Sequence, residues 1–167
     1  VSTLGKFRIF GPDAASWLNL MNTRPVTGLG QNRIRYTAAC NEEGVVIDDG
    51  VVIRTAEDDY YFTTSTARSA AVVGWYRRFK KPEWKAWLVN LSDARAAMNL
   101  VGPKARQSLQ VVTDADVGNS ALPFMGWIAA DVAGVPVILL RMGFLGELGY
   151  EIHCPASRGA FLWKRIL

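Results

Sequence analysis

Apolar residues in the first half of the chain fall in short runs that polar turns separate. The runs cover residues 33–40, 45–54 and 60–64, and "NEEG" and "TAEDD" lie between them. Runs of this length that are rich in Val, Ile and Tyr are typical of strands. Residues 67–79 then carry apolar side chains at helical spacing. The pattern therefore predicts three strands followed by a helix.

The second half shows the same order of elements. Strands are expected at residues 127–131, 135–142 and 150–154, joined by "VAGVP" and "GFLGELG". A helix is expected at residues 156–167, where the apolar positions again have helical spacing. The two halves are therefore predicted to contain the same elements.

A weak internal repeat supports this comparison. The segment "FRIFGPDAASWLNL" at residues 7–20 resembles "MNLVGPKARQSLQV" at residues 98–111, with Gly-Pro in the middle of each. Proline suits a first helical position because its φ is already fixed and it lacks an N–H that would be unpaired there. Each segment therefore predicts a strand, a tight turn and a helix.

These elements predict an α+β fold, with mainly antiparallel sheets covered by helices. Two repeated βαββα units are expected, over residues 1–80 and 81–167, and together they would form one domain. The boundary is expected within "RRFKKPEWKAW" at residues 77–87, where a proline ends the helix.

Composition changes this picture little. The 167 residues are 50% hydrophobic and 20% charged, which is ordinary for a globular protein. The net charge of +4 permits an anionic ligand. No dense Lys/Arg stripe is present, so we expect no nucleic-acid partner. Cys40 and Cys154 are far apart in the sequence and His153 is the single histidine, so no metal-ligand spacing can be assembled from these residues and no metal site is expected.

Targeting signals are also missing from the sequence given. No apolar run approaches the roughly 20 residues of a membrane span, and the first residues do not resemble a signal peptide. We therefore expect a cytoplasmic protein without a membrane partner. The sequence starts at Val1 and stops inside an amphipathic helix, so it is interpreted as a fragment of a longer chain.

Two adjacent acids, Asp48 and Asp49, interrupt the most apolar run of the chain. If one strand runs through "VVIDDGVVIR", its period of two places Asp49 on the apolar face with Val51 and Ile53. A buried, unpaired carboxylate costs several kcal/mol, so this position implies a partner, a ligand or proton chemistry. Asp49 is expected to point into a cavity, and Asp48 to be held by local hydrogen bonds or to face solvent. The alternative is a hairpin turn at Asp49-Gly50, because Asp-Gly favours such turns.

A third acid, Glu151, follows a glycine-rich stretch. Gly143, Gly146 and Gly149 have the spacing G-x-x-G-x-x-G, which differs from the dinucleotide-binding pattern, and no helix follows. Such glycines allow a tight turn or close approach of the backbone to a ligand. Glu151 is therefore a candidate ligand contact, and the alternative is an exposed glutamate on an edge strand.

Several segments, taken together, point to one known family. They are "STLGKFRIFGPDAASWLN", "NRIRYTAACNEEGVVIDDGVVIR", "LVGPKARQSL", "LPFM" and "GFLGELGYEIHCP". In order and spacing they resemble the folate-binding domain of the aminomethyltransferase family, which includes the glycine-cleavage T-protein, sarcosine oxidase alpha subunits and dimethylglycine dehydrogenase. The specific part is NE-x-G-x-x-x-DD followed by G-E-x-G-Y-E. The "DDGVVIR" and "PEW" details resemble the sarcosine oxidase alpha subunit most.

This resemblance implies tetrahydrofolate as cofactor and one-carbon transfer as activity. It implies that Asp49 is catalytic, approaching the folate N10 and assisting its attack on a methylene-imine or aminomethyl donor. It implies that Glu151 holds the pterin, since one carboxylate can accept hydrogen bonds from the N3–H and the 2-amino group together.

Further cofactor contacts follow from the same resemblance. Tyr36, Phe124 and Phe144 fall where the family lines the pterin and aminobenzoyl slot, and flat apolar walls suit a flat ligand. Asp48 and Ser65 are the remaining candidates for cofactor binding. Phe144 stands where T-proteins commonly have tyrosine, and Ser65 is near a position that is asparagine in them.

The resemblance implies an enzyme part, here of a sarcosine oxidase that forms 5,10-methylenetetrahydrofolate from a methylated amine or its imine. Flavin and NAD would belong to partner domains or subunits. The enzymatic alternative is a T-protein or a related folate-dependent demethylase, and the non-enzymatic one is a folate-binding or scaffolding relative. The family continues past residue 167 into a segment that contacts folate, so the present segment is expected to be inactive alone.

Overall fold

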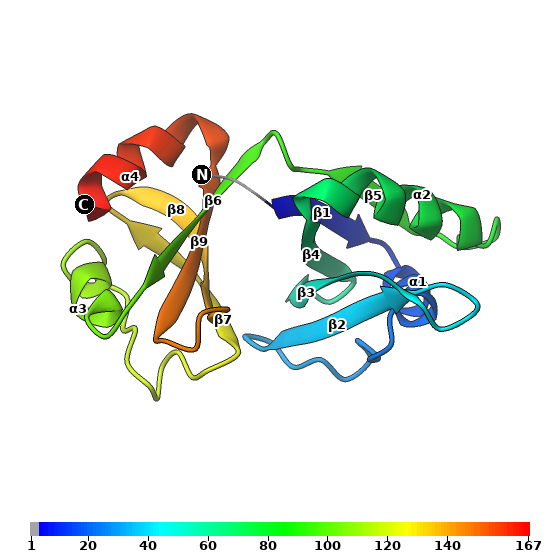
Figure 1. The fold of residues 1–167 in the computed structure, drawn as a ribbon, viewed down its shortest axis with the longest axis horizontal. Coiled ribbons are helices and arrows are strands. Elements are labelled where there is room, and N and C mark those ends of the chain that lie inside the picture. Colours follow the sequence, from blue (N-terminus) through cyan, green and yellow to red (C-terminus); the bar gives the residue numbers. More distant parts are fainter. Residues whose placement is uncertain (1–3) are drawn as a thin grey trace. The chain divides into compact units, whose positions relative to one another are not determined.

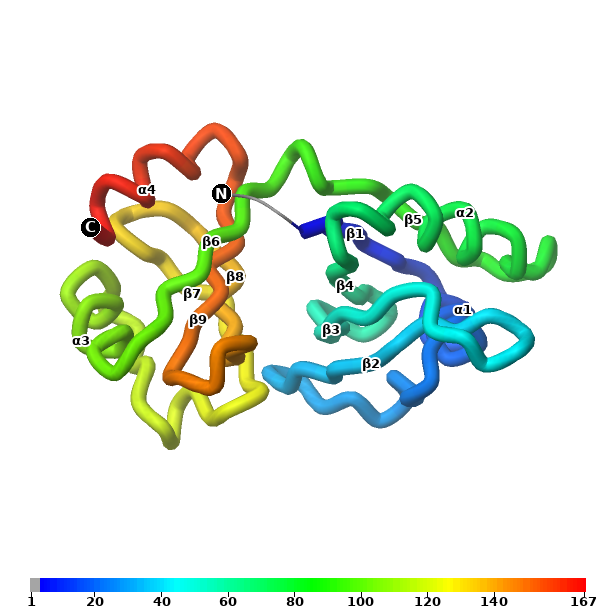
Figure 2. The backbone as a smooth tube through the Cα atoms, viewed as in Figure 1, coloured from blue at the N-terminus to red at the C-terminus, as the bar shows by residue number. Residues whose placement is uncertain are grey.

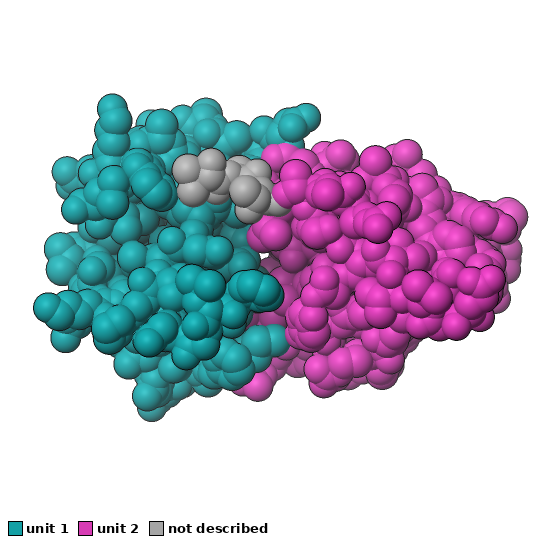
Figure 3. All heavy atoms as spheres, in the orientation of Figure 1, with its two compact units in different colours: residues 1–2, 93–167 teal, residues 3–92 magenta. Residues whose placement is uncertain are grey.

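The computed structural model describes residues 4–167, which form two compact units, residues 4–92 and Asp93–Leu167 (Figure 1, Figure 3). Each unit has one antiparallel sheet with helices packed on one of its faces. The predicted α+β class with mainly antiparallel sheets is therefore confirmed.

The first unit contains a five-stranded sheet with the strand order β2-β3-β4-β1-β5. Its strands are β1 (Leu4–Phe10), β2 (Ile34–Cys40), β3 (Val46–Ala56), β4 (Asp59–Ser65) and β5 (Trp87–Asn90). Its helices are α1 (Ala14–Met21), the short 3-10 helix η1 (Thr66–Arg68) and α2 (Ser69–Phe79). The strands and the second helix predicted from the apolar runs are all present, with ends that differ by a few residues.

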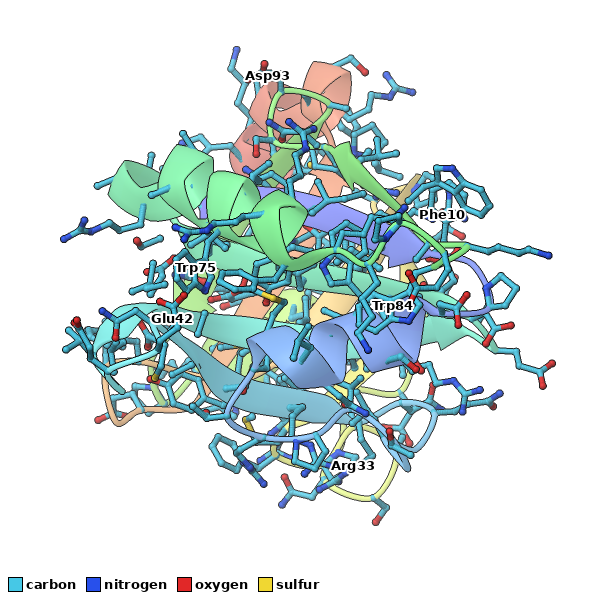
Figure 4. The ribbon with its side chains drawn as sticks, turned by 90° about the vertical axis from the view of Figure 1, so that its right-hand side faces the viewer. Phe10, Arg33, Glu42, Trp75, Trp84 and Asp93 are labelled. Atoms are coloured by element: carbon cyan, nitrogen blue, oxygen red, sulfur yellow. The ribbon has the colours of Figure 1, made fainter. Side chains whose placement is uncertain are left out.

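Aromatic side chains connect the sheet of the first unit to its helices. Phe62 of β4 stacks on Phe7 of β1, with ring centroids 5.2 Å apart, and on Tyr76 of α2, at 5.3 Å. The indole N–H of Trp17 in α1 donates a hydrogen bond to the carbonyl of Tyr76. Figure 4 shows α1 and α2 in front of the strands that they cover. These contacts fix both helices on the same face of the sheet.

The second unit contains a four-stranded sheet with the strand order β6-β9-β8-β7. Its strands are β6 (Arg95–Val101), β7 (Gly126–Val132), β8 (Val135–Arg141) and β9 (Gly149–Pro155). Its helices are α3 (Ala105–Gln110), the 3-10 helix η2 (Ala156–Arg158) and α4 (Gly159–Ile166). Leu109 of α3 and Leu162 of α4 are fully buried in the core beneath this sheet.

The Gly-Pro turns occupy equivalent positions in the two units. Gly11 has φ +114° and Gly102 has φ +132°, a region that L side chains rarely adopt. The N–H of Gly11 donates to the carbonyl of Asp58, and that of Gly102 to the carbonyl of Leu148, both at 2.9 Å. In Figure 2 each turn leads from the first strand of its unit into a helix, α1 or α3. The internal repeat seen in the sequence is therefore a repeat of structure.

The connection between the units follows β5. This strand pairs antiparallel with β1, and Trp87 lies opposite Phe10. The chain thus returns from α2 to the first sheet before it enters the second unit at Asp93. A division at residue 80 would separate β5 from the sheet that it extends. The expected assignment of the two halves to one folate-binding domain stays a prediction.

Candidate functional site

The paired aspartates lie within β3, which runs without interruption over Val46–Ala56. Asp49 is opposite Ala38 of β2, and the register continues regularly through Gly50. The alternative of a hairpin turn at Asp49-Gly50 is therefore wrong.

The exposure of the two aspartates is the reverse of the expected one. Asp48 is buried, with 8% of its surface exposed, whereas Asp49 is exposed. Asp48 shares with Val52 the face of β3 that the helices cover, and Asp49 lies on the other face. The expectation that Asp49 lies on the buried apolar face was wrong, since residues 51–53 are buried on both faces of the strand and do not mark that face. Asp49 still contributes to the lining of a small cavity. An apolar run of this kind does not show which face the helices cover.

Asp48 is held by a hydrogen bond to a neighbouring strand. Its Oδ2 accepts the backbone N–H of Ser65 at 2.9 Å. Ser65 is the last residue of β4 and the N-cap residue of η1. The expectation that hydrogen bonding holds Asp48 is confirmed, and two of the predicted site residues lie together here.

A small cavity of ≈ 20 Å³ adjoins Asp48 on the helix-covered face. Its polar lining includes Asn22, Thr37, Thr64 and Tyr76. A polar cavity of this volume has room for about one water molecule. The hydroxyl of Tyr76 accepts a hydrogen bond from Nδ2 of Asn22 at 2.8 Å. Burial, with a smaller contribution from the charge of Asp48, raises the pKa of Tyr76 above its usual range.

Asn22 and Tyr76 were not foreseen as neighbours of the acid pair. They come from the end of α1 and from α2, far from β3 in the sequence. Only helix packing brings them to Asp48, and no motif in the sequence indicated it.

Asp49 has a different partner, Tyr36 of β2. The hydroxyl of Tyr36 donates a hydrogen bond to Oδ2 of Asp49, and half of the tyrosine is exposed. The pair is diagonal across the ladder, since Tyr36 lies opposite Val51. This hydrogen bond, with smaller contributions from burial and the charge of Asp49, raises the pKa of Tyr36. The structure thus brings two further predicted site residues together on the exposed end of the strand pair.

Glu151 lies on β9, an inner strand between β6 and β8. It is opposite Asn99 of β6 and Leu140 of β8, so the alternative of an edge strand is wrong. Its Oε2 lies 3.1 Å from Nε2 of His153, two residues along the same face. The side chain of His153 is fully buried, and that of Glu151 is 14% exposed. The i, i+2 spacing of Glu151 and His153 in "YEIHC" places both on one face of a strand and could have indicated this contact.

Two predicted aromatic contacts are exposed. Phe124 precedes β7 and is 63% exposed, and Phe144 is 98% exposed in the loop before β9. Large exposed apolar side chains are more informative than buried ones, because folding alone does not explain them. Core packing, the ordinary interpretation of Phe124, therefore does not apply.

Other chemistry is sparse in the part of the chain that the structure describes. No group of three His, Cys, Asp or Glu side chains there could hold a metal ion. Cys40 and Cys154 are free thiols. No helix within residues 4–167 is long and apolar enough to cross a membrane.

Fold and candidate site together define a class of protein. This chain consists of two repeated α+β units with antiparallel sheets, and each unit has a carboxylate on an inner strand that contacts a neighbouring side chain. Comparison with known proteins identifies the family within this class.

The sequence model of the GCVT N-terminal domain matches residues 1–167. The sarcosine oxidase subunit alpha of Corynebacterium sp. (strain P-1) is 36% identical over 171 residues, covering 99% of this chain and 18% of that protein. The aminomethyltransferase of Bacillus subtilis (strain 168) is 33% identical over 168 residues, covering 100% of this chain and 45% of that protein. This chain belongs to the GCVT N-terminal domain family, as its motifs indicated. It spans less than half the length of these curated relatives.

A solved structure has the same fold. The glycine cleavage system aminomethyltransferase T from Bartonella henselae superimposes with a TM-score of 0.86, at 23% identity. The match covers 100% of this chain and 44% of that one. The shared fold confirms the architecture, and the roles of individual residues stay predictions.

Proposed function

We propose that this chain is the tetrahydrofolate-binding part of a longer one-carbon-transfer enzyme of the aminomethyltransferase type. The observation that carries the proposal is the family match, which extends over residues 1–167 and includes the acids of β3 and β9. Relatives of this chain are named aminomethyltransferase and sarcosine oxidase subunit alpha.

The acceptor groups of Glu151 support the proposal that it holds the pterin ring. A carboxylate offers about four acceptor sites, and His153 engages one oxygen. Glu151 therefore has acceptor capacity for the two adjacent donors of a pterin edge. The exposed rings of Phe124 and Phe144 offer the flat apolar surface that such a ligand needs.

Asp49 is the proposed proton acceptor. When bound, tetrahydrofolate supplies the nitrogen that takes up the one-carbon unit. Oδ2 of Asp49 accepts the hydroxyl of Tyr36, which leaves Oδ1 available to accept a proton at the exposed face of β3. Tyr36 orients the carboxylate, and Asp48 holds the end of β4 through Ser65 without facing solvent itself.

The finer proposal is a sarcosine oxidase alpha subunit that forms 5,10-methylenetetrahydrofolate from a methylated amine or its imine. The relative of 36% identity supports it, and its name, subunit alpha, implies further subunits. Flavin and NAD would then be bound by other domains or subunits. The second candidate is a T-protein, supported by the aminomethyltransferase relative at 33% identity. Flavin that copurifies with the full-length protein would favour the first candidate over the second.

The test compares Asp49→Asn with Asp58→Asn in the full-length protein. Asp58 provides the matched control because it is an exposed acid in the turn between β3 and β4. We expect Asp49→Asn to lower the tetrahydrofolate-dependent turnover by about 10²–10⁴-fold, the usual contribution of a general acid or base. Asp58→Asn should keep wild-type turnover, and both variants should bind tetrahydrofolate.

Three outcomes would contradict parts of this proposal. Unchanged turnover in Asp49→Asn would remove Asp49 from the mechanism. Tetrahydrofolate binding without turnover in the wild-type protein would identify a non-catalytic, scaffolding relative. A full-length protein that binds no folate would overturn the proposal as a whole.

A further inference from the structure

Glu151 and His153 lie on the same face of β9, because strand residues two positions apart point to the same side. Nε2 of His153 is 3.1 Å from Oε2 of Glu151. Both residues belong to the part of β9 that pairs with β6 on one side and with β8 on the other. The two ladders fix the backbone here, so the two side chains meet at a defined place on the sheet.

The contact indicates which nitrogen of His153 carries a hydrogen. An ionised carboxylate only accepts hydrogen bonds, so the ring nitrogen that faces it has to be the donor. Nε2 can carry this hydrogen in the neutral ring and carries it in the imidazolium. The contact is therefore interpreted as a hydrogen bond from Nε2–H to the carboxylate of Glu151.

The two partners differ in exposure. The side chain of His153 is fully buried, whereas that of Glu151 is 14% exposed. A ligand can therefore touch the carboxylate but not the imidazole. His153 can act on a ligand only through Glu151, so its role is that of a positioning residue.

The cross-strand neighbours of Glu151 are less suited to hold its carboxylate. Opposite it on β8 is Leu140, which is fully buried and has no donor in its side chain. Opposite it on β6 is Asn99, which is exposed. Holding a long, flexible glutamate in one rotamer costs conformational entropy. Among these three neighbours, the buried imidazole is the group that can hold the carboxylate in place before a ligand arrives.

We propose that His153 fixes the orientation of the Glu151 carboxylate and thereby sets how tightly the ligand of Glu151 is bound. This inference rests on the proposed function, in which that ligand is the pterin of tetrahydrofolate. Two adjacent donors are accepted together only when both carboxylate oxygens point at them. The hydrogen bond to Oε2 sets the rotation of the group. Because each oxygen has two lone pairs, this bond leaves acceptor sites on both.

Substitution of His153 in the full-length protein tests this role, with the dissociation constant of tetrahydrofolate as the readout. His153→Leu removes the donor, so affinity should fall by about 10–100-fold, the usual contribution of a hydrogen bond to a charged group. His153→Gln places an amide N–H near the position of Nε2 and should recover most of this loss. His153→Asn is one carbon shorter, places its amide nearer Nδ1, and should not recover it.

A double-mutant cycle separates positioning from general structural damage. If His153 acts through Glu151, His153→Leu should change affinity by less than about threefold once Glu151→Gln is present. Ile152→Val is the matched control, because Ile152 lies between the two residues and packs in the core on the other face. That variant should lower stability and keep an affinity within about twofold of wild type.

Nitrogen NMR of the His153 ring gives a readout that needs no folate. In the unliganded full-length protein it should show a hydrogen on Nε2, with the signal assigned by its loss in His153→Gln. The Nε2 signal should shift in Glu151→Gln.

Three results would overturn the proposal: a ring whose only hydrogen is on Nδ1, wild-type affinity in His153→Leu, or the same loss from His153→Leu with and without Glu151→Gln. A wild-type protein that binds no folate would instead overturn the proposed function. The position of the ring hydrogen would then still show whether His153 donates to Glu151, so the two failures are distinguishable.

Discussion

The backbone N–H of Ser65 donates a hydrogen bond to Oδ2 of Asp48, at a distance of 2.9 Å. One residue is in β3, and the other closes β4 where the chain turns into η1. A buried carboxylate therefore accepts the backbone N–H of the last residue of β4. The neighbouring acid, Asp49, is exposed and accepts a hydrogen bond from the side chain of Tyr36.

Removing Asp48 should destabilise the fold. In Asp48→Ala the N–H of Ser65 loses its acceptor, so the free energy of unfolding should fall by about 1–3 kcal/mol. Asp48→Asn keeps one carbonyl oxygen as acceptor and should lose less. Denaturant unfolding measures both changes. Asp49→Ala, at the exposed neighbouring position, should cost less than about 1 kcal/mol. Equal losses at the two positions would contradict the structural role of Asp48.

The ionisation of Tyr36 should depend on Asp49. The hydrogen bond to Asp49 raises the pKa of Tyr36, so Asp49→Asn should bring it back toward the ordinary value of about 10. Ultraviolet absorbance of the tyrosinate, followed during an alkaline titration, measures this change. Tyr36→Phe assigns the signal, because Tyr36 is half exposed while the other tyrosines are buried.

The sign of the accompanying stability change follows from the raised pKa. Above about pH 10 the unfolded state loses the Tyr36 proton before the folded state does. The contribution of Tyr36 to stability is thus present below the unfolded pKa and is lost as the pH rises through the folded pKa. Asp49→Asn should remove this dependence, and a titration that is the same in both proteins would argue against the Tyr36–Asp49 hydrogen bond.

Gly50 should not tolerate a side chain. A Cβ at this position would lie 2.0 Å from the backbone oxygen of Thr63 in the neighbouring strand β4. Gly50→Ala should therefore destabilise the protein by about 1–3 kcal/mol or more, as overpacking does. Gly74→Ala is the matched control, because a Cβ there meets nothing within 4 Å on α2. That control should stabilise the protein by about 0.5–1 kcal/mol, and thermal or denaturant unfolding compares the two variants.

Glu151→Gln should weaken folate binding in the full-length protein. The amide places a donor where the proposed pterin edge needs an acceptor, so affinity should fall by roughly 2–4 kcal/mol. Calorimetric titration with tetrahydrofolate or folinic acid measures the difference. Glu147→Gln is the control, since Glu147 is an exposed acid in the loop before β9. Wild-type affinity in Glu151→Gln would show that Glu151 does not anchor the pterin.

Local patterns predicted the elements of this fold well. The strands stand out because β-branched and aromatic runs alternate with turn residues, and the Gly-Pro segments repeat. The exposure of the acid pair could not be predicted in the same way. Three successive buried residues, 51–53, remove the alternation that distinguishes the two faces of β3.

Contacts between segments far apart in the sequence could not be predicted from local patterns either. The Tyr36–Asp49 pair depends on the β2–β3 register, and Tyr76 reaches the neighbourhood of Asp48 only because α2 packs on that face. The family resemblance predicted that Tyr36, Asp48, Asp49 and Ser65 are site residues. It did not indicate which of them hold one another.

The cavity beside Asp48 limits the size of any molecule that can approach the acid pair from beneath the sheet. At ≈ 20 Å³ it admits a solvent molecule, whereas sites for small organic ligands occupy about 300–1,000 Å³. The helix-covered side of β3 thus has room for about one water molecule but not for an organic ligand. A ligand of folate size can reach this strand only from the side on which Asp49 and Tyr36 lie.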